Sequence, residues 1–313
     1  MIQVLANSLV PIFVGLLFGY AAGLFKIVDN KDVTSLVSFL MTFALPCSLF
    51  VTIACTPRQL LWEQADVAVV LAMVFLVVFV ATYYASRNLA KNTAADSAVL
   101  ALTLGFPNHA GVGIPLLLAV YGPAASVSVA VGLAVGAITI TPITLAILES
   151  GTSRTSSSAA RFRLSLWRAF KKPVVWAPVL GVLASVAKVH MPTYLDKSLT
   201  IFGGATEGTA LFVTGLTASA LRFNLHWGVG WAVLGKNVLQ PALCLAVALL
   251  FGMPLEQTRF AVLLSAIPSG FFGVLFGKGF DAATEASSSS LIASTMLSIF
   301  TLAGWIVVLS HLH

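Results

Sequence analysis

The chain has 313 residues, of which 58% are hydrophobic and only 9% charged, and its mean hydropathy is +0.98. An average soluble domain carries about 25% charged residues, so this composition excludes a water-covered globular protein and suits lipid instead. The net charge is +6, which we assign to basic loops beside a membrane, and no nucleic-acid partner is predicted. The three cysteines show neither metal-ligand nor disulfide spacing, so no metal and no cofactor is predicted.

Apolar runs predict ten transmembrane helices with short loops, and therefore an all-α integral membrane protein. The predicted spans are 4–25, 33–55, 66–86, 97–120, 124–148, 174–190, 199–221, 228–251, 259–279 and 287–310. A polar, serine-rich loop at 149–172 separates the fifth span from the sixth.

The basic residues are distributed unevenly between the two sets of loops. Ten spans place twelve Lys and Arg residues on one side and four on the other, with Lys236 left inside a span. The positive-inside rule makes the richer side cytoplasmic. The 149–172 loop is then cytoplasmic, and both termini are predicted to be extracytoplasmic.

The two halves of the chain repeat short motifs at nearly one spacing. Leu-Phe-Val-Thr occurs at 49–52 and again at 211–214, 162 residues later. Phe-Pro-Asn-His at 106–109 corresponds to Ile-Pro-Ser-Gly at 267–270, 161 residues later. Five spans per half is an odd number, so the second half must enter the membrane from the opposite face.

This pattern predicts an inverted-topology repeat, with residues 1–148 and 173–313 as its two members and 149–172 between them. Inverted repeats are the usual plan of secondary transporters, because two halves that exchange conformations provide alternating access.

Prolines interrupt the fourth and ninth spans near the predicted bilayer midplane. Pro107 and Pro268 each lie about ten residues into a span. Each removes a backbone donor, in a glycine-rich setting that includes Gly111 and Gly270, and Pro115 is expected to break the fourth span again. We expect the two breaks to meet and to present N–H groups to a carboxylate. The alternative is that the prolines only kink two helices.

Polar side chains directly follow these breaks. Asn108 can bind a carboxylate or a hydroxyl, and Ser269 occupies the matching position in the second half. His109 can titrate near neutral pH and could couple protons, or it can be a neutral histidine bonded to a helix carbonyl.

Two charged residues, Glu207 and Lys236, lie deep in predicted spans seven and eight. Intramembrane charges mark functional sites by default. In one interpretation Lys236 holds an anion or exchanges partners with Glu207 during transport. In the other, the two residues form a permanent ion pair between helices.

The sequence resembles the auxin efflux carrier family, the prokaryotic relatives of the plant PIN carriers, over nearly the whole chain. The resemblance rests on Leu-Gly-Phe-Pro-Asn-His-Ala-Gly-Val-Gly-Ile-Pro-Leu-Leu at 104–117, on Lys236 followed by Pro241, and on Ala-Ile-Pro-Ser-Gly at 266–270. It implies two inverted five-helix repeats with crossing broken helices four and nine. It also implies a scaffold of spans one, two, six and seven, a moving transport domain of the other spans, and a possible homodimer through the scaffold. Glu207 and the absence of a long plant-type cytoplasmic loop depart from the family pattern.

Members of this family move organic anions, and this sequence looks most like bacterial malonate transporters of the inner membrane. The resemblance therefore implies a secondary active, elevator-type carrier of malonate or a related dicarboxylate, coupled to protons or sodium. An auxin-like monocarboxylate is the alternative substrate, and an anion channel or membrane sensor is the alternative class. No nucleophile–base arrangement suggests an enzyme.

The predicted site combines the two breaks with the intramembrane charges. Substrate binding is assigned to Pro107, Asn108, His109, Gly111, Pro268, Ser269, Gly270 and Lys236, and coupling to Glu207 and His109.

Overall fold

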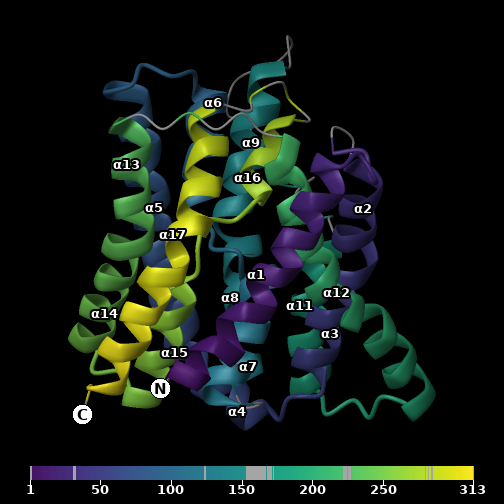
Figure 1. The fold of residues 1–313 in the computed structure, drawn as a ribbon. Helices are drawn as coiled ribbons and strands as arrows, with labels where there is room; N and C mark the ends of the chain where they lie inside the picture. The colour runs from purple at the N-terminus through teal and green to yellow at the C-terminus, as the bar shows by residue number, and fades with distance from the viewer. Residues whose placement is uncertain are drawn as a thin grey trace. The chain divides into compact units, whose positions relative to one another are not determined.

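The computed structural model describes residues 2–30, 33–122, 125–152, 167, 171, 173–220, 224, 227–278, 280, 282 and 285–312. These residues form α-helices and short π-helices, and no β-strand occurs among them (Figure 1). The prediction of an all-helical protein is therefore confirmed.

Interrupted helices are common in the first half of the chain. Its helices are α1 Ile2–Leu24, α2 Thr34–Phe39, η1 Leu40–Ala44, α3 Leu45–Ala54, α4 Arg58–Glu63, α5 Ala65–Asn88, α6 Ala94–Gly105, η2 His109–Gly113, α7 Ile114–Tyr121, α8 Ser126–Ile138 and α9 Ile140–Thr152. The second half contains α11 Pro173–Val186, α12 Thr193–Ala220, α13 Trp227–Leu234, η4 Gly235–Leu239, α14 Gln240–Leu250, α15 Leu255–Ala266, α16 Phe272–Lys278 and α17 Glu285–Ser310.

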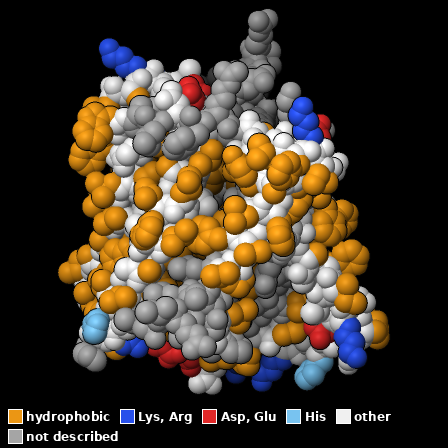
Figure 2. Space-filling view, in the orientation of Figure 1, with side chains coloured by type: hydrophobic (Ala, Val, Ile, Leu, Met, Phe, Trp, Pro, Cys, Tyr) orange, Lys and Arg blue, Asp and Glu red, His pale blue; other side chains and the backbone are white. Residues whose placement is uncertain are grey.

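Several helical stretches are long and apolar enough to cross a membrane. In the described part of the chain these are Thr34–Ala54, Arg58–Asn88, Val127–Ser150, Trp227–Leu250 and Glu285–Ser310. Shorter apolar helices occupy Phe13–Leu24, Ala94–Gly105, Gly111–Tyr121 and Pro173–Val186. Large hydrophobic side chains such as Phe18, Leu250 and Phe300 are exposed, and such side chains cover the middle of the helices on the face in Figure 2. The chain is therefore a multi-pass membrane protein.

The boundaries of the sixth and seventh predicted spans differ from those of the helices in the structure. α11 ends at Val186, before the predicted end at 190, because Lys188 adopts a left-handed conformation with φ of +52°. The N–H of Val189 then donates to the Ala184 carbonyl, which closes the helix end. α12 begins at Thr193 rather than at 199, since its first turns are polar and hydropathy does not detect them.

Each π-helix in the described part of the chain ends two residues before a proline. η1, η2 and η4 each have five residues, and Pro46, Pro115 and Pro241 are the second residues of the α-helices that follow. Proline lacks an N–H and clashes with the carbonyl four residues before it, and a wider turn relieves the clash. The expectation that Pro115 breaks the fourth span is therefore wrong, since η2 continues directly into α7.

The chain contacts define two compact units, each built from segments distant in sequence. The first unit contains Met1–Ala68, His109–Ala134 and Lys172–Ala220. In it α1 packs along α12, and glycines allow the close approach: a β-carbon on Gly19 would overlap the Phe212 carbonyl, and one on Gly215 would overlap that of Leu16. Small residues serve the same purpose in other membrane helix pairs.

The second unit contains Val69–Asn108, Val135–Lys171 and Leu221–His313. In it α6 packs against α9, α16 and α17, while α13 runs beside α17 (Figure 1). Many of its buried side chains are polar. On α17 they include Ser287, Ser289, Ser290, Ser294 and Ser298.

Candidate transport site

Two helices of the second unit are interrupted, and their interruptions contact each other. α6 ends at Gly105 and α15 at Ala266, so the breaks fall where Pro107 and Pro268 predicted them. Pro107 and Ser269 form an antiparallel β-bridge. The N–H of Asn108 donates to the Pro268 carbonyl at 2.9 Å, and the N–H of Gly270 donates to the Thr103 carbonyl at 3.1 Å. The unwound backbone thus satisfies part of its own hydrogen-bonding need, as a membrane interior requires.

Glycines on the α15–α16 side permit this close crossing. A β-carbon on Gly270 would overlap the Phe106 carbonyl oxygen, and one on Gly273 would overlap the backbone and hydroxyl of α6 at Val99 and Thr103. Gly105 is different, because a β-carbon there would meet its nearest neighbours at 3.5 Å, an ordinary contact distance. Of these three glycines, the close crossing therefore requires Gly270 and Gly273 but not Gly105.

A side-chain network ties the second break to α17 and η4. The N–H of Ser269 donates to Ser294 Oγ at 3.0 Å, and Ser294 Oγ donates to Asn237 Oδ1 at 2.6 Å. Asn237 Nδ2 returns a bond to the Ser294 carbonyl at 3.0 Å. All three residues are buried. Sequence reasoning missed Asn237 and Ser294, although a buried-span asparagine next to Lys236 was a usable signal.

The π-helix η4 has its own side-chain support. In a regular α-helix the Asn237 carbonyl would accept the N–H of residue 241, but Pro241 has none. Trp305 Nε1 on α17 donates to that carbonyl at 3.0 Å. The indole thus replaces the missing backbone donor.

Lys236 and Gln240 reach the ends of the two broken helices. Lys236 is 1% exposed, and its Nζ donates at 2.8 Å to the carbonyl of Ser265, in the last turn of α15. The last four carbonyls of a helix lack intrahelical partners and carry the negative end of its dipole, so an ammonium group suits this position. Gln240 Nε2 makes a longer contact, 3.4 Å, with the carbonyl of Gly105, the last residue of α6.

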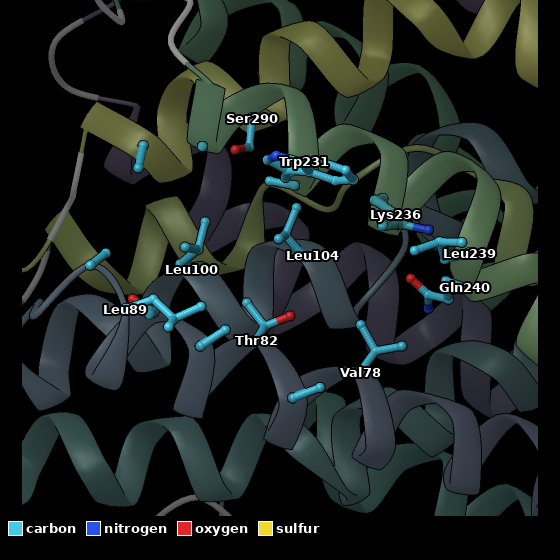
Figure 3. Close-up of a pocket in the computed structure, with 18 of the residues that line it drawn as sticks. Val78, Thr82, Leu89, Leu100, Leu104, Trp231, Lys236, Leu239, Gln240 and Ser290 are labelled. Carbon is cyan, nitrogen blue, oxygen red and sulfur yellow. The ribbon is translucent and has the colours of Figure 1, made fainter.

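The same two residues line a cavity of about 600 Å³ that lies within the second unit (Figure 3). Its walls come from α5, α6, the α13–η4–α14 helix and α17, and they are mostly apolar. Lys236 is the one ionisable residue among the described residues that line it. A cavity of this size can hold a small organic molecule.

The structure divides the predicted site residues between the two units. Pro107, Asn108, Pro268, Ser269, Gly270 and Lys236 belong to the second unit and lie at or beside the paired breaks. His109 and Gly111 belong to the first unit, where both are buried in η2, which packs against α12. Glu207 lies near the middle of α12, also in the first unit, but its side chain is outside the described residues. Its pairing with Lys236 therefore stays a prediction.

Comparison with known proteins places this sequence in a family. A family model described as "Membrane transport protein" matches residues 4–306. The uncharacterized transporter YfdV of Escherichia coli (strain K12) is 28% identical over 311 residues, which cover 98% of each chain. Auxin efflux carrier component 8 of Arabidopsis thaliana is 24% identical over 154 residues, 47% of this chain and 42% of its own length.

The fold and these similarities define a multi-pass membrane transporter. The chain belongs to the membrane transport protein family, which includes proteins like the auxin efflux carriers, and the resemblance inferred from the broken-helix motifs is confirmed. The members of this family are membrane transporters.

Proposed function

We propose that the chain is a secondary active transporter of a small organic anion, with malonate or a related dicarboxylate as the leading substrate. The observation that carries this proposal is the contact between the two interrupted helices, with a buried Lys236 at the end of one of them. Paired, proline-interrupted helices are the best pointer to a transport site in this kind of architecture.

In this proposal the ten spans form two inverted five-helix repeats, 1–148 and 173–313, joined by a cytoplasmic segment at 149–172. The chain then lies in a bacterial inner membrane with both termini extracytoplasmic. The spacing of 161 residues between Pro107 and Pro268, both at helix interruptions, supports the repeat. η4 departs from it, because α5, the corresponding helix of the first half, is α-helical throughout.

Anion recognition would use the polar groups at the breaks. Asn108 and the Ser269 hydroxyl are buried there and can bond a carboxylate. Lys236 adds positive charge: its ammonium group has three N–H donors, of which the Ser265 carbonyl takes one. Because burying a lone carboxylate costs several kcal/mol, a nearby ammonium would contribute strongly to selecting an anion.

The units suggest how such a carrier would move. The first unit collects α1, α3, α11 and α12, the helices expected in a scaffold, together with η2 and α7. The second collects both helix breaks and the cavity, as a transport domain should. We therefore propose elevator-type alternating access, with a homodimer through the scaffold and with coupling through His109 or Glu207 if protons drive transport. Sodium bound by unwound carbonyls is the other candidate coupling ion.

Uptake of labelled malonate into proteoliposomes tests the proposal, with imposed proton and sodium gradients applied separately. Saturable uptake driven by one gradient, with counterflow by unlabelled malonate, is the expected result. If an auxin-like monocarboxylate competes better than malonate, that monocarboxylate replaces malonate as the leading substrate. Uptake without saturation or counterflow would indicate a channel. If folded, inserted protein takes up no carboxylate at all, the proposal that it transports organic anions would be contradicted.

A further inference from the structure

The Gln240 side chain has a fixed orientation beside the cavity. It is 1% exposed, and its Nε2 faces the Gly105 carbonyl at 3.4 Å. A carbonyl can only accept, so the amide nitrogen must occupy this side and the amide oxygen the other. In Figure 3 that oxygen points toward the other labelled lining residues.

The Gln240 amide oxygen is a buried acceptor that lacks a protein donor in the described structure. A buried polar atom without a partner is costly, and it therefore points to a missing partner. Ser290 Oγ, buried on the wall formed by α17, is in the same condition. A 600 Å³ cavity with a buried, unpaired acceptor and a buried, unpaired hydroxyl is a site prepared for a polar ligand.

The chemistry of the Gln240 oxygen restricts that ligand. An amide oxygen accepts but never donates, so its partner must carry an O–H or N–H. A fully ionised dicarboxylate has only acceptor oxygens and would meet this oxygen without forming a bond. Its two charges would also face one cation, since Lys236 is the single ionisable residue among the described lining residues.

We propose that Gln240 is a specificity-determining residue of the cavity and that the ligand is a small organic monoanion bearing one hydrogen-bond donor. The singly protonated form of a dicarboxylic acid and a hydroxycarboxylate both have this chemistry. The carboxylate is compensated by Lys236, the donor bonds to Gln240, and the Ser290 hydroxyl adds a polar contact. This inference rests on the proposed function: it narrows the substrate and places it in the cavity, whose lining includes Lys236 but neither Asn108 nor Ser269.

Two malonic acid derivatives of similar size test this directly. Malonamate and monomethyl malonate both carry one carboxylate near pH 7, but only malonamate has N–H donors. Binding to the purified protein in detergent is measured by thermal shift, which follows ligand affinity without requiring transport. We expect the wild-type protein to bind malonamate about tenfold more tightly, because the ester leaves the Gln240 oxygen unpaired.

Gln240→Met removes the amide while keeping the length of the side chain, and it should abolish the preference. Gln257→Met is the matched control: Gln257 Oε1 is also buried and unpaired, but Gln257 does not line the cavity, so the preference should remain. The comparison of the two acids in wild-type protein stands even if Gln240→Met fails to fold.

Equal binding of the two acids by the wild-type protein would overturn the proposal, as would a preference that persists in Gln240→Met. Binding of neither acid would overturn it as well. Selective binding without uptake in proteoliposomes would support the role of Gln240 while contradicting transport, so the two failures are distinguishable.

Discussion

Lys236 Nζ lies 2.8 Å from the Ser265 carbonyl oxygen, and the bond joins the π-helix η4 to the last turn of the broken helix α15. The contact brings a positive charge to the negative end of a helix that stops inside the membrane. It gives the intramembrane lysine a structural partner, in addition to any role with an anion.

Replacing Lys236 should therefore affect both stability and transport. Lys236→Met should lower the free energy of unfolding by roughly 1–3 kcal/mol, because a buried carbonyl loses a charged donor. It should also reduce anion uptake at least tenfold, since the cavity loses its cation. Thermal unfolding and proteoliposome uptake measure the two effects. Full anion uptake by the Lys236→Ala protein would show that Lys236 does not belong to the transport site.

Gly270 and Gly105, one at each break, should respond differently to replacement by alanine. Gly270→Ala places a β-carbon against the Phe106 carbonyl and should destabilise the protein by about 1–3 kcal/mol or separate the paired breaks. Gly105→Ala has room, because the nearest neighbours of a β-carbon there lie at 3.5 Å. Gly105 is in the last turn of α6, where alanine should be neutral or should stabilise the protein by up to about 1 kcal/mol. Thermal unfolding of both variants in one detergent is the measurement. If the Gly270→Ala and Gly105→Ala proteins are equally stable, the stability of the protein does not depend on the close crossing.

Trp305 and Pro241 should be energetically coupled although they do not share a hydrogen bond. Trp305→Phe removes the donor to the Asn237 carbonyl and should cost about 1–2 kcal/mol. In a Pro241→Ala background residue 241 regains an N–H that can serve that carbonyl, so the same change should cost less. A double-mutant cycle by thermal unfolding measures the coupling. Additive effects would contradict the replacement of a backbone donor by the indole.

Cys55, exposed at the end of α3, should be a poor nucleophile. Partial burial raises the pKa of its thiol, and the nearby Asp196 carboxylate, 3.7 Å away, raises it further by its charge and hydrogen bond. A raised pKa means less thiolate at pH 8, so alkylation should be slow there and accelerate as the pH rises. Asp196→Asn removes the charge and should lower the pKa and increase the rate at pH 8.

The measurement is maleimide labelling against pH in a Cys47→Ser, Cys244→Ser background, with Lys197→Gln as the control for a charge change on the same helix turn. An unchanged rate in Asp196→Asn would show that the carboxylate does not control the thiol. Because Cys55 lies between two membrane-length helices, labelling of intact cells with an impermeant reagent would also test the predicted topology.

By itself, the sequence determined that this protein is helical and crosses a membrane, because so few charged residues leave lipid as its only suitable solvent. It also determined where two helices stop, since a proline without an N–H acts on its own neighbourhood whatever surrounds it. Pro115 and Pro241 show the limit of this rule, because a π-turn absorbs each of them and the helix continues.

Tertiary structure alone decided which side chains support the breaks. Ser294, Trp305 and Gln240 are far along the chain from most of the groups that they contact, and hydropathy assigns them simply to predicted helices. Their roles depend on which face of each helix packs against the breaks, and packing partners are set by the fit of whole helices. Local backbone preference is encoded residue by residue, whereas the pairing of buried polar groups exists only once the helices have assembled.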